Sequence, residues 1–228
     1  MNNFKLSDLQ KRLDEVIKVS YDLFCKKMSG GCFSIYNEAS MQLQLGVILQ
    51  SVGQLYLFSK EDHFAIELEY VWKDADGNPY KFKRHMCKTE SGKPRCDILI
   101  SLSHGKKICT AAIELKYFKK SNGETTTDNR FSIYKDIENL EVYKEEKGLS
   151  LGYVIAYTDN INYTTNNTNS KFNIGQDYVL GPGKIKHHNN EDSEFVQLCA
   201  PYVFKWSKES ESNNCFLFVH PLNEDSMN

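Results

Sequence analysis

The sequence lacks the features of several common protein classes. It has seven cysteines but no Cys-x-x-Cys pair, and several of the cysteines lie in apolar runs, where a thiol behaves as a small hydrophobic side chain. A disulfide framework is therefore not expected. No apolar run reaches membrane-spanning length, and the first residues lack the charged-then-apolar layout of a signal peptide. These absences predict a soluble cytoplasmic protein with no membrane partner.

Motifs for several kinds of chemistry are also missing. The chain has no phosphate-binding loop, no dinucleotide-binding glycine motif, no serine nucleophile motif and no internal repeat. The histidines and cysteines at His85, Cys87 and Cys96, and the pair His187-His188, do not have the paired spacing of a structural zinc site. Zinc is therefore a minor alternative.

The composition is that of a folded domain. The chain has 228 residues, of which 40% are hydrophobic and 25% charged, which is enough for one core. We predict a single domain, with N-terminal helices in 1–60, a central core in 64–157 and a C-terminal elaboration in 158–228. Charge is uneven: residues 81–120 carry eleven Lys and Arg against three Asp and Glu, within a net charge of −2. This excess of +8 favours a polyanionic partner, and a solvated basic hairpin is the alternative.

Two amphipathic helices are predicted near the N-terminus. The first runs over 7–28, opens on the capping-box pattern Ser7-x-x-Gln10 and ends at Ser29-Gly30-Gly31. The second runs over about 37–52 and has a stripe of apolar residues along one face. Glu38 falls on the same face as this stripe. The apolar members of that stripe are Met41, Leu45, Ile48, Leu49 and Val52.

Strand patterns dominate the centre of the chain. Alternation predicts a strand over 64–72, then a turn at 76–79 with a candidate partner strand at 80–88. Strands at 95–103 and 109–118 form a second hairpin, followed by a helix over 130–147, which Gly148 ends, and a strand over 151–157. This order predicts an α/β fold whose central mixed sheet is flanked by helices. The polar segment 158–194 is either functional or poorly ordered, and a last hairpin is expected from 201–206 and 215–220.

The central hairpin carries the most specific chemistry. A turn centred on Gly105-Lys106 places Asp97 opposite Glu114, on one sheet face with Lys116. Two opposed carboxylates repel each other unless positive charge lies between them, and Mg²⁺ binds one or two carboxylates while keeping several waters. Lys116 would then contact a phosphate or assist an attacking water. The apolar residues Ile98, Ile100, Leu102, Ile113 and Leu115 would fill the core on the other face.

A salt bridge between Lys116 and either acid is the competing interpretation. The Glu-x-Lys spacing alone is uninformative, because Glu145-Glu146-Lys147 repeats it in a charged helix end. Only the first copy lies in an apolar strand, where an acid is costly without a partner or a metal.

The segments Pro94-Arg95-Cys96-Asp97 and Glu114-Leu115-Lys116 resemble the PD-(D/E)xK motif of the restriction-endonuclease-like nucleases. The resemblance covers about the central third of the chain. It differs in that Cys96, not proline, precedes Asp97. It implies a restriction-endonuclease-like core in which Asp97, Glu114 and the Leu115 carbonyl bind Mg²⁺, with Mn²⁺ able to substitute, and Lys116 assists the hydrolytic water.

Members of this family often carry a further acid on a preceding helix, and Glu38 matches that place. On the apolar stripe it is expected to point to the core, as a metal ligand or, equally, as a salt-bridged or helix-capping acid. Glu67 and Glu69 are lower-ranked candidates. Members also often place a polar residue and a tyrosine on the helix after the hairpin, facing the site or the nucleic-acid backbone, and Tyr134-Lys135-Asp136 and Tyr143 are available there. Residues expected to contact nucleic acid are Lys119, Lys120, Arg130, Tyr134 and Lys135, although Tyr134 also suits a core position.

The predicted function is a Mg²⁺-dependent endonuclease that hydrolyses phosphodiester bonds in DNA, with RNA not excluded. By analogy with restriction or phage-defence enzymes, a homodimer is expected. The alternatives are a catalytically inactive nuclease-like domain that binds nucleic acid or protein, and an interaction protein whose basic hairpin meets an acidic partner.

Overall fold

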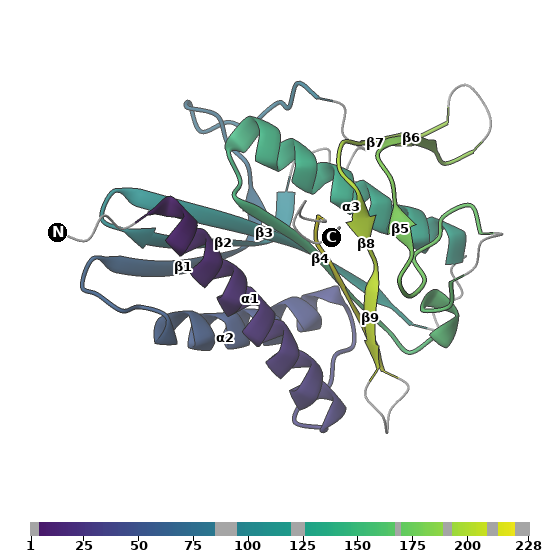
Figure 1. Cartoon of the computed structure of the whole chain (residues 1–228), viewed down its shortest axis with the longest axis horizontal. Helices are drawn as coiled ribbons and strands as arrows, with labels where there is room; N and C mark the ends of the chain where they lie inside the picture. Colours follow the sequence, from purple (N-terminus) through teal and green to yellow (C-terminus); the bar gives the residue numbers. More distant parts are fainter. Residues whose placement is uncertain are drawn as a thin grey trace.

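The computed structural model describes residues 5–84, 95–119, 126–166, 170–188, 193–208 and 214–221. A mixed six-stranded sheet has the order β1-β2-β3-β4-β10-β9, and only β3 and β4 run parallel. Figure 1 shows α1 crossing in front of the sheet with α2 below it. The helices are α1 (Leu6–Ser29), α2 (Glu38–Leu55) and α3 (Thr126–Lys147), and the strands are β1 (Asp62–Val71), β2 (Arg95–His104), β3 (Lys107–Phe118), β4 (Leu151–Thr158), β9 (Lys205–Lys208) and β10 (Cys215–Val219). The predicted α/β class, mixed sheet and hairpin followed by a βαβ unit are confirmed.

The sheet separates two hydrophobic cores. On one face, Phe24 of α1 and Leu45 of α2 pack with Ile98 and Ile113 of the central hairpin. On the other face, α3 packs on Leu99, Ala112 and Val154 with the C-terminal part of the chain. The alternation predicted for β2 and β3 is therefore correct, and the residues expected in the core are fully buried.

The first helix is capped differently from the prediction. The Lys5 backbone N–H donates to Asp8 Oδ2 at 3.0 Å, and Ser7 lies inside the first turn, so the Ser7 and Gln10 capping box is wrong. Asp8 is also an acid at the positive end of the helix dipole, which favours this start. The second helix starts as predicted, with Asn37 Oδ1 accepting from the Ser40 N–H at 2.8 Å.

Two other boundaries differ. Residues 80–84 form no strand, and β1 pairs with β2 instead; the rest of the expected partner, 85–88, lies outside the described residues. The preceding turn is closed locally, because Asp74 Oδ1 accepts from the N–H groups of Asp76 and Asn78. Helix α3 begins at Thr126, four residues before the prediction, because its polar first turn has no apolar residue to mark the period.

Much of the 158–194 segment packs against the rest of the protein. It contributes η2 (Ile161–Tyr163), β5 (Val179–Leu180) and β6 (Gly183–Lys186). Strand β5 pairs with β8 (Tyr202–Val203), and β6 with β7 (Phe195–Leu198). The last predicted hairpin exists, but its first strand is β9, because 202–203 pairs elsewhere. Of the helices in the described residues, none combines the length and apolar character needed to cross a membrane.

Candidate functional site

The turn of the central hairpin sets the register of the site. Gly105 takes a left-handed backbone, with φ of +56°, in the two-residue connection between His104 and Lys107. Pairing continues to Ile98 opposite Ile113, so Asp97 and Glu114 are the next residues of the two strands. The predicted juxtaposition is confirmed, and the one-residue shift that would separate these acids onto opposite faces is excluded.

Regular pairing of β2 with β3 ends at this point, and Asp97 takes the place of a backbone acceptor. Its Oδ2 accepts the Leu115 N–H at 2.6 Å. Glu114 is 5% exposed, and its Oε1 has no hydrogen-bond partner among the described residues. Burial raises the pKa of both carboxyl groups, and the Asp97 charge raises the pKa of Glu114 further. The two acids therefore form a site that is short of positive charge.

Lys116 joins this pair of acids to α3. Its Nζ lies 2.8 Å from Asp136 Oδ2 and donates to the Leu115 carbonyl at 3.0 Å. Burial alone would lower the pKa of Lys116, but the carboxylates of Asp136, Glu38 and Asp97 outweigh it and raise that pKa, so the ammonium stays charged. Burial raises the pKa of Asp136 to about 6, although Lys116 opposes this. Of the residues expected on this helix, Asp136 is the polar one that faces the site. Lys116 forms its salt bridge with Asp136 and not, as the competing interpretation had it, with Asp97 or Glu114.

The predicted burial of Glu38 is wrong, because this residue is exposed at the N-terminus of α2. Its carboxylate nevertheless reaches the end of β3, where Oε1 accepts from the Tyr117 N–H at 3.4 Å. Desolvation and the Asp97 charge raise the pKa of Glu38, while Lys116 lowers it. Glu38 thus interacts electrostatically with Asp97 and Lys116, although its own side chain is exposed to solvent.

Gln42 is a member of the site that the sequence pattern did not single out. It is 7% exposed, one helical turn after Glu38, and its Nε2 donates to the Asp97 carbonyl at 2.6 Å and to Glu69 Oε1 at 3.0 Å. Glu69 has a φ of +54° and pairs with Arg95 at 2.7 Å. A polar residue at i+4 from Glu38, beside an apolar stripe, was the available signal.

The residues predicted to contact nucleic acid divide into two groups. Lys119 is exposed after β3, and Lys135 is partly exposed, with Nζ 3.4 Å from Glu194. Arg130 and Tyr134 instead point inward and hold the 158–194 segment on α3, which corrects their predicted role. Arg130 donates to the Asn162 carbonyl at 2.7 Å, and the buried Tyr134 hydroxyl donates to the Asn173 carbonyl at 2.8 Å. Lys120 and Pro94 lie outside the described residues.

The donor set suits Mg²⁺ better than zinc. Asp97 and Glu114 offer two neighbouring carboxylates, one with a buried unpartnered oxygen, and Mg²⁺ binds one or two carboxylates together with waters. Within the part of the chain that the structure describes, no three His, Cys, Asp or Glu side chains converge as a metal cluster. His187 bonds to Asp128 at 3.0 Å, and His85 and Cys87 lie outside the described ranges.

Comparison with known proteins adds no relative to this description. No family model, curated protein or solved structure matches the chain. The geometry of the site is therefore the basis for inferring a function.

Proposed function

We propose that the protein is a Mg²⁺-dependent endonuclease that hydrolyses phosphodiester bonds in DNA, on a restriction-endonuclease-like core. The observation that carries the proposal is the meeting of Asp97, Glu114 and Lys116 where β2 and β3 separate, with a buried Glu114 oxygen that lacks a partner. Burying an oxygen without a partner costs free energy unless a cation or a hydrogen-bond donor binds to it. RNA is the alternative polymer.

The residues have distinct roles in this proposal. Asp97, Glu114 and the Leu115 carbonyl would hold Mg²⁺ or Mn²⁺. Glu38 does not converge with these two acids as a third ligand among the described residues, and would favour the metal through its charge. When bound, such a metal polarises the phosphate and lowers the pKa of its water. Lys116 supplies a fixed positive charge beside the scissile phosphate rather than a base, because its pKa is raised. Asp136 is a positioning residue that keeps this ammonium in place.

Plasmid cleavage tests the proposal. Purified protein is incubated with supercoiled plasmid and Mg²⁺ or EDTA, beside Asp97→Asn, Glu114→Gln and Lys116→Met. Each variant and EDTA should lower the initial rate by roughly 100-fold or more, because each removes a group that stabilises charge in the transition state. A control exists in the second Glu-x-Lys copy, where Glu145→Gln and Lys147→Met should cut like the native protein. Undiminished cutting by the site variants would refute the proposal.

An inactive nuclease-like domain that binds nucleic acid or protein is the second candidate, and one observation favours it. Both backbone groups of Leu115 already have internal partners, since its N–H bonds to Asp97 and its carbonyl to Lys116. A domain of this kind would retain DNA without cutting it, equally in the native chain and in Asp97→Asn. For the active form, we propose a homodimer in restriction or phage defence, because two sites cut two strands.

A further inference from the structure

A cavity of about 770 Å³ lies away from the candidate nuclease site. It opens between the N-terminal half of α1 and the C-terminal half of α3, over the start of β4 and the end of β10. Its lining contains none of Asp97, Glu114, Lys116 or Asp136. Pockets that bind small molecules have volumes of about 300 to 1,000 Å³, so this cavity is large enough for one.

The walls combine apolar side chains with the start of β4, which β10 does not cover among the described residues. Ile137 and Leu140 of α3 and Val219 of β10 line the cavity. Among the described residues, which end at Pro221 after β10, β4 pairs with β10 only as far as Val154, and residues 151–153 pair with β3. The Tyr153 ring, also in the lining, is fixed by a 2.6 Å hydrogen bond from its hydroxyl to Asp14. Ile137, Val219 and Tyr153 are at most 2% exposed, so the apolar surface that a ligand could reach comes from the partly exposed Leu151, Ala200 and Pro221, which also line the cavity.

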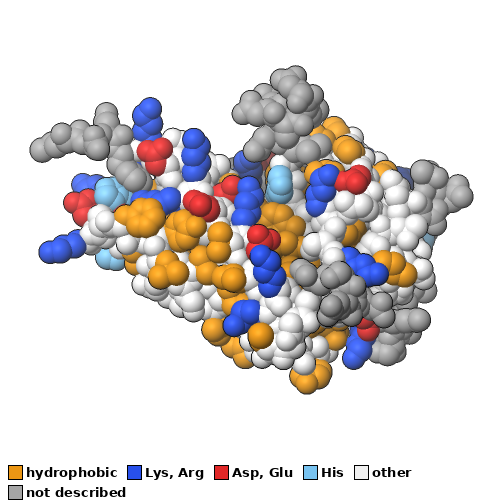
Figure 2. All heavy atoms as spheres, turned by 60° about the horizontal axis from the view of Figure 1, so that its bottom comes forward, with side chains coloured by type: hydrophobic (Ala, Val, Ile, Leu, Met, Phe, Trp, Pro, Cys, Tyr) orange, Lys and Arg blue, Asp and Glu red, His pale blue; other side chains and the backbone are white. Residues whose placement is uncertain are grey.

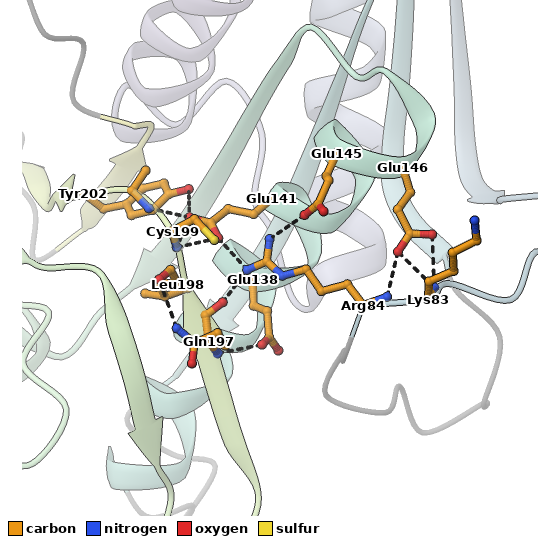
Figure 3. A network of polar contacts seen from close by, with 11 residues as sticks. Lys83, Arg84, Glu138, Glu141, Glu145, Glu146, Gln197, Leu198, Cys199 and Tyr202 are labelled. Atoms are coloured by element: carbon orange, nitrogen blue, oxygen red, sulfur yellow. Dashed lines mark hydrogen bonds and ion pairs between the residues drawn. The ribbon is translucent and has the colours of Figure 1, made fainter.

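Charge in the lining favours an anion. All three lining acids are paired: Asp14 with Lys18 at 2.8 Å, and Glu141 and Glu145 with Arg84 at 2.8 and 3.2 Å. Figure 3 shows Arg84 reaching these two α3 acids, while Glu141 also meets Cys199 and Tyr202. Lys11 and Lys144 line the same cavity, both are exposed, and neither has an ion pair among the described residues. The lining therefore has uncompensated positive charge.

We propose that this cavity binds an anionic small molecule with an aromatic body, about the size of a mononucleotide. Leu151, Ala200 and Pro221 would receive the ring, and Lys11 and Lys144 would hold the anionic group. The nuclease reaction does not use the cavity, so the proposal stands independently of the proposed function.

Fluorescence titration of the full chain with 8-anilinonaphthalene-1-sulfonate tests it, with AMP and adenosine as competitors. The probe should bind at one site per chain, and AMP should displace it at least tenfold more effectively than adenosine. Lys11→Ala with Lys144→Ala should weaken probe binding about tenfold, the loss expected for two charge contacts. Lys26→Ala with Lys27→Ala, elsewhere on α1, is the matched control.

Ala200→Phe provides a second test, because it adds a ring to a lining residue while keeping its backbone N–H, which donates to Glu141. This variant should lose probe binding and keep the far-UV spectrum of the native protein. Absence of probe binding, equal competition by AMP and adenosine, or binding that both cavity variants leave unchanged would each overturn the proposal.

Discussion

Lys116 and Asp136 show how single residues set the electrostatics of the candidate site. Their ion pair joins the middle of the sheet to α3, and both groups are largely buried. Four carboxyl groups lie around the Lys116 ammonium, and the pKa of each is raised. They belong to Glu38, Asp97, Glu114 and Asp136. The site thus carries more negative charge than its own cation neutralises, which is the condition in which a divalent cation binds most favourably.

A pH dependence of stability follows from Asp136. Its pKa is about 6 in the folded protein and about 3.9 when unfolded, so its contribution is fully present below about 3.9 and is lost as pH rises through about 6. Between pH 7 and pH 5 the native protein should therefore gain about 1 kcal/mol relative to Asp136→Asn, a shift in Tm of roughly 2–4 °C. Thermal unfolding of both proteins in EDTA, at pH 5 and pH 7, measures this shift in Tm.

Asp22→Asn, at an exposed position on α1, is the control for this series and should follow the native pH profile. A Tm difference between the native protein and Asp136→Asn that does not change from pH 5 to pH 7 would contradict the assignment. Cleavage should show the opposite trend and fall as pH is lowered, because the metal site needs ionised carboxylates and the pKa of Asp97 and of Glu114 is raised.

At the scale of elements, α2 has apolar side chains on both faces. Met41, Leu45 and Leu49 are buried in the core, whereas Leu43 and Val47 are 56% and 57% exposed. Figure 2, turned so that the bottom of Figure 1 comes forward, shows hydrophobic side chains gathered on this face. Exposed apolar patches commonly mark interaction surfaces, so α2 is the element that best suits the proposed homodimer.

Leu43→Lys with Val47→Lys should therefore convert a dimer to a monomer, because it places two charges in an apolar contact. Size-exclusion chromatography with light scattering measures the mass, and Gln50→Lys, at another exposed position of α2, should leave it unchanged. A native protein that is monomeric at all concentrations would refute the homodimer. A double variant that stays dimeric would place the interface elsewhere.

Across the whole molecule, Glu141 connects α3 with the C-terminal part of the chain. Its carboxylate accepts from the N–H groups of Cys199 and Ala200, from the Tyr202 hydroxyl and from Arg84 (Figure 3). Arg84 also donates to the Gln197 carbonyl. Backbone and side-chain donors from two distant segments thus converge on one buried carboxylate of α3.

Glu141→Gln should lower the free energy of unfolding by roughly 3 kcal/mol, because it leaves the Arg84 charge and several donors incompletely paired in a buried setting. Urea unfolding measures the change. Glu145→Gln is the matched control: this side chain is 61% exposed, contacts the same Arg84 and should cost less than about 1 kcal/mol. If both variants lowered the free energy of unfolding equally, burial of the Glu141 network would not contribute to stability.

The sequence alone determined the central hairpin, the βαβ order and the placing of Asp97 beside Glu114. These depend on local rules: side chains alternate along strands, a two-residue turn fixes the register, and glycine ends a helix. The predictions failed where the local signal was polar, as at the start of α3, or where two capping residues competed, as at Ser7 and Asp8.

Only the tertiary structure decided which groups meet from distant segments. It placed Asp136 against Lys116, brought Gln42 to the Asp97 carbonyl, left Glu38 on the solvent side and turned Arg130 and Tyr134 inward. Such contacts depend on how α2, α3 and the 158–194 segment pack on the sheet. Packing joins residues with no fixed spacing along the chain, so no sequence period records them.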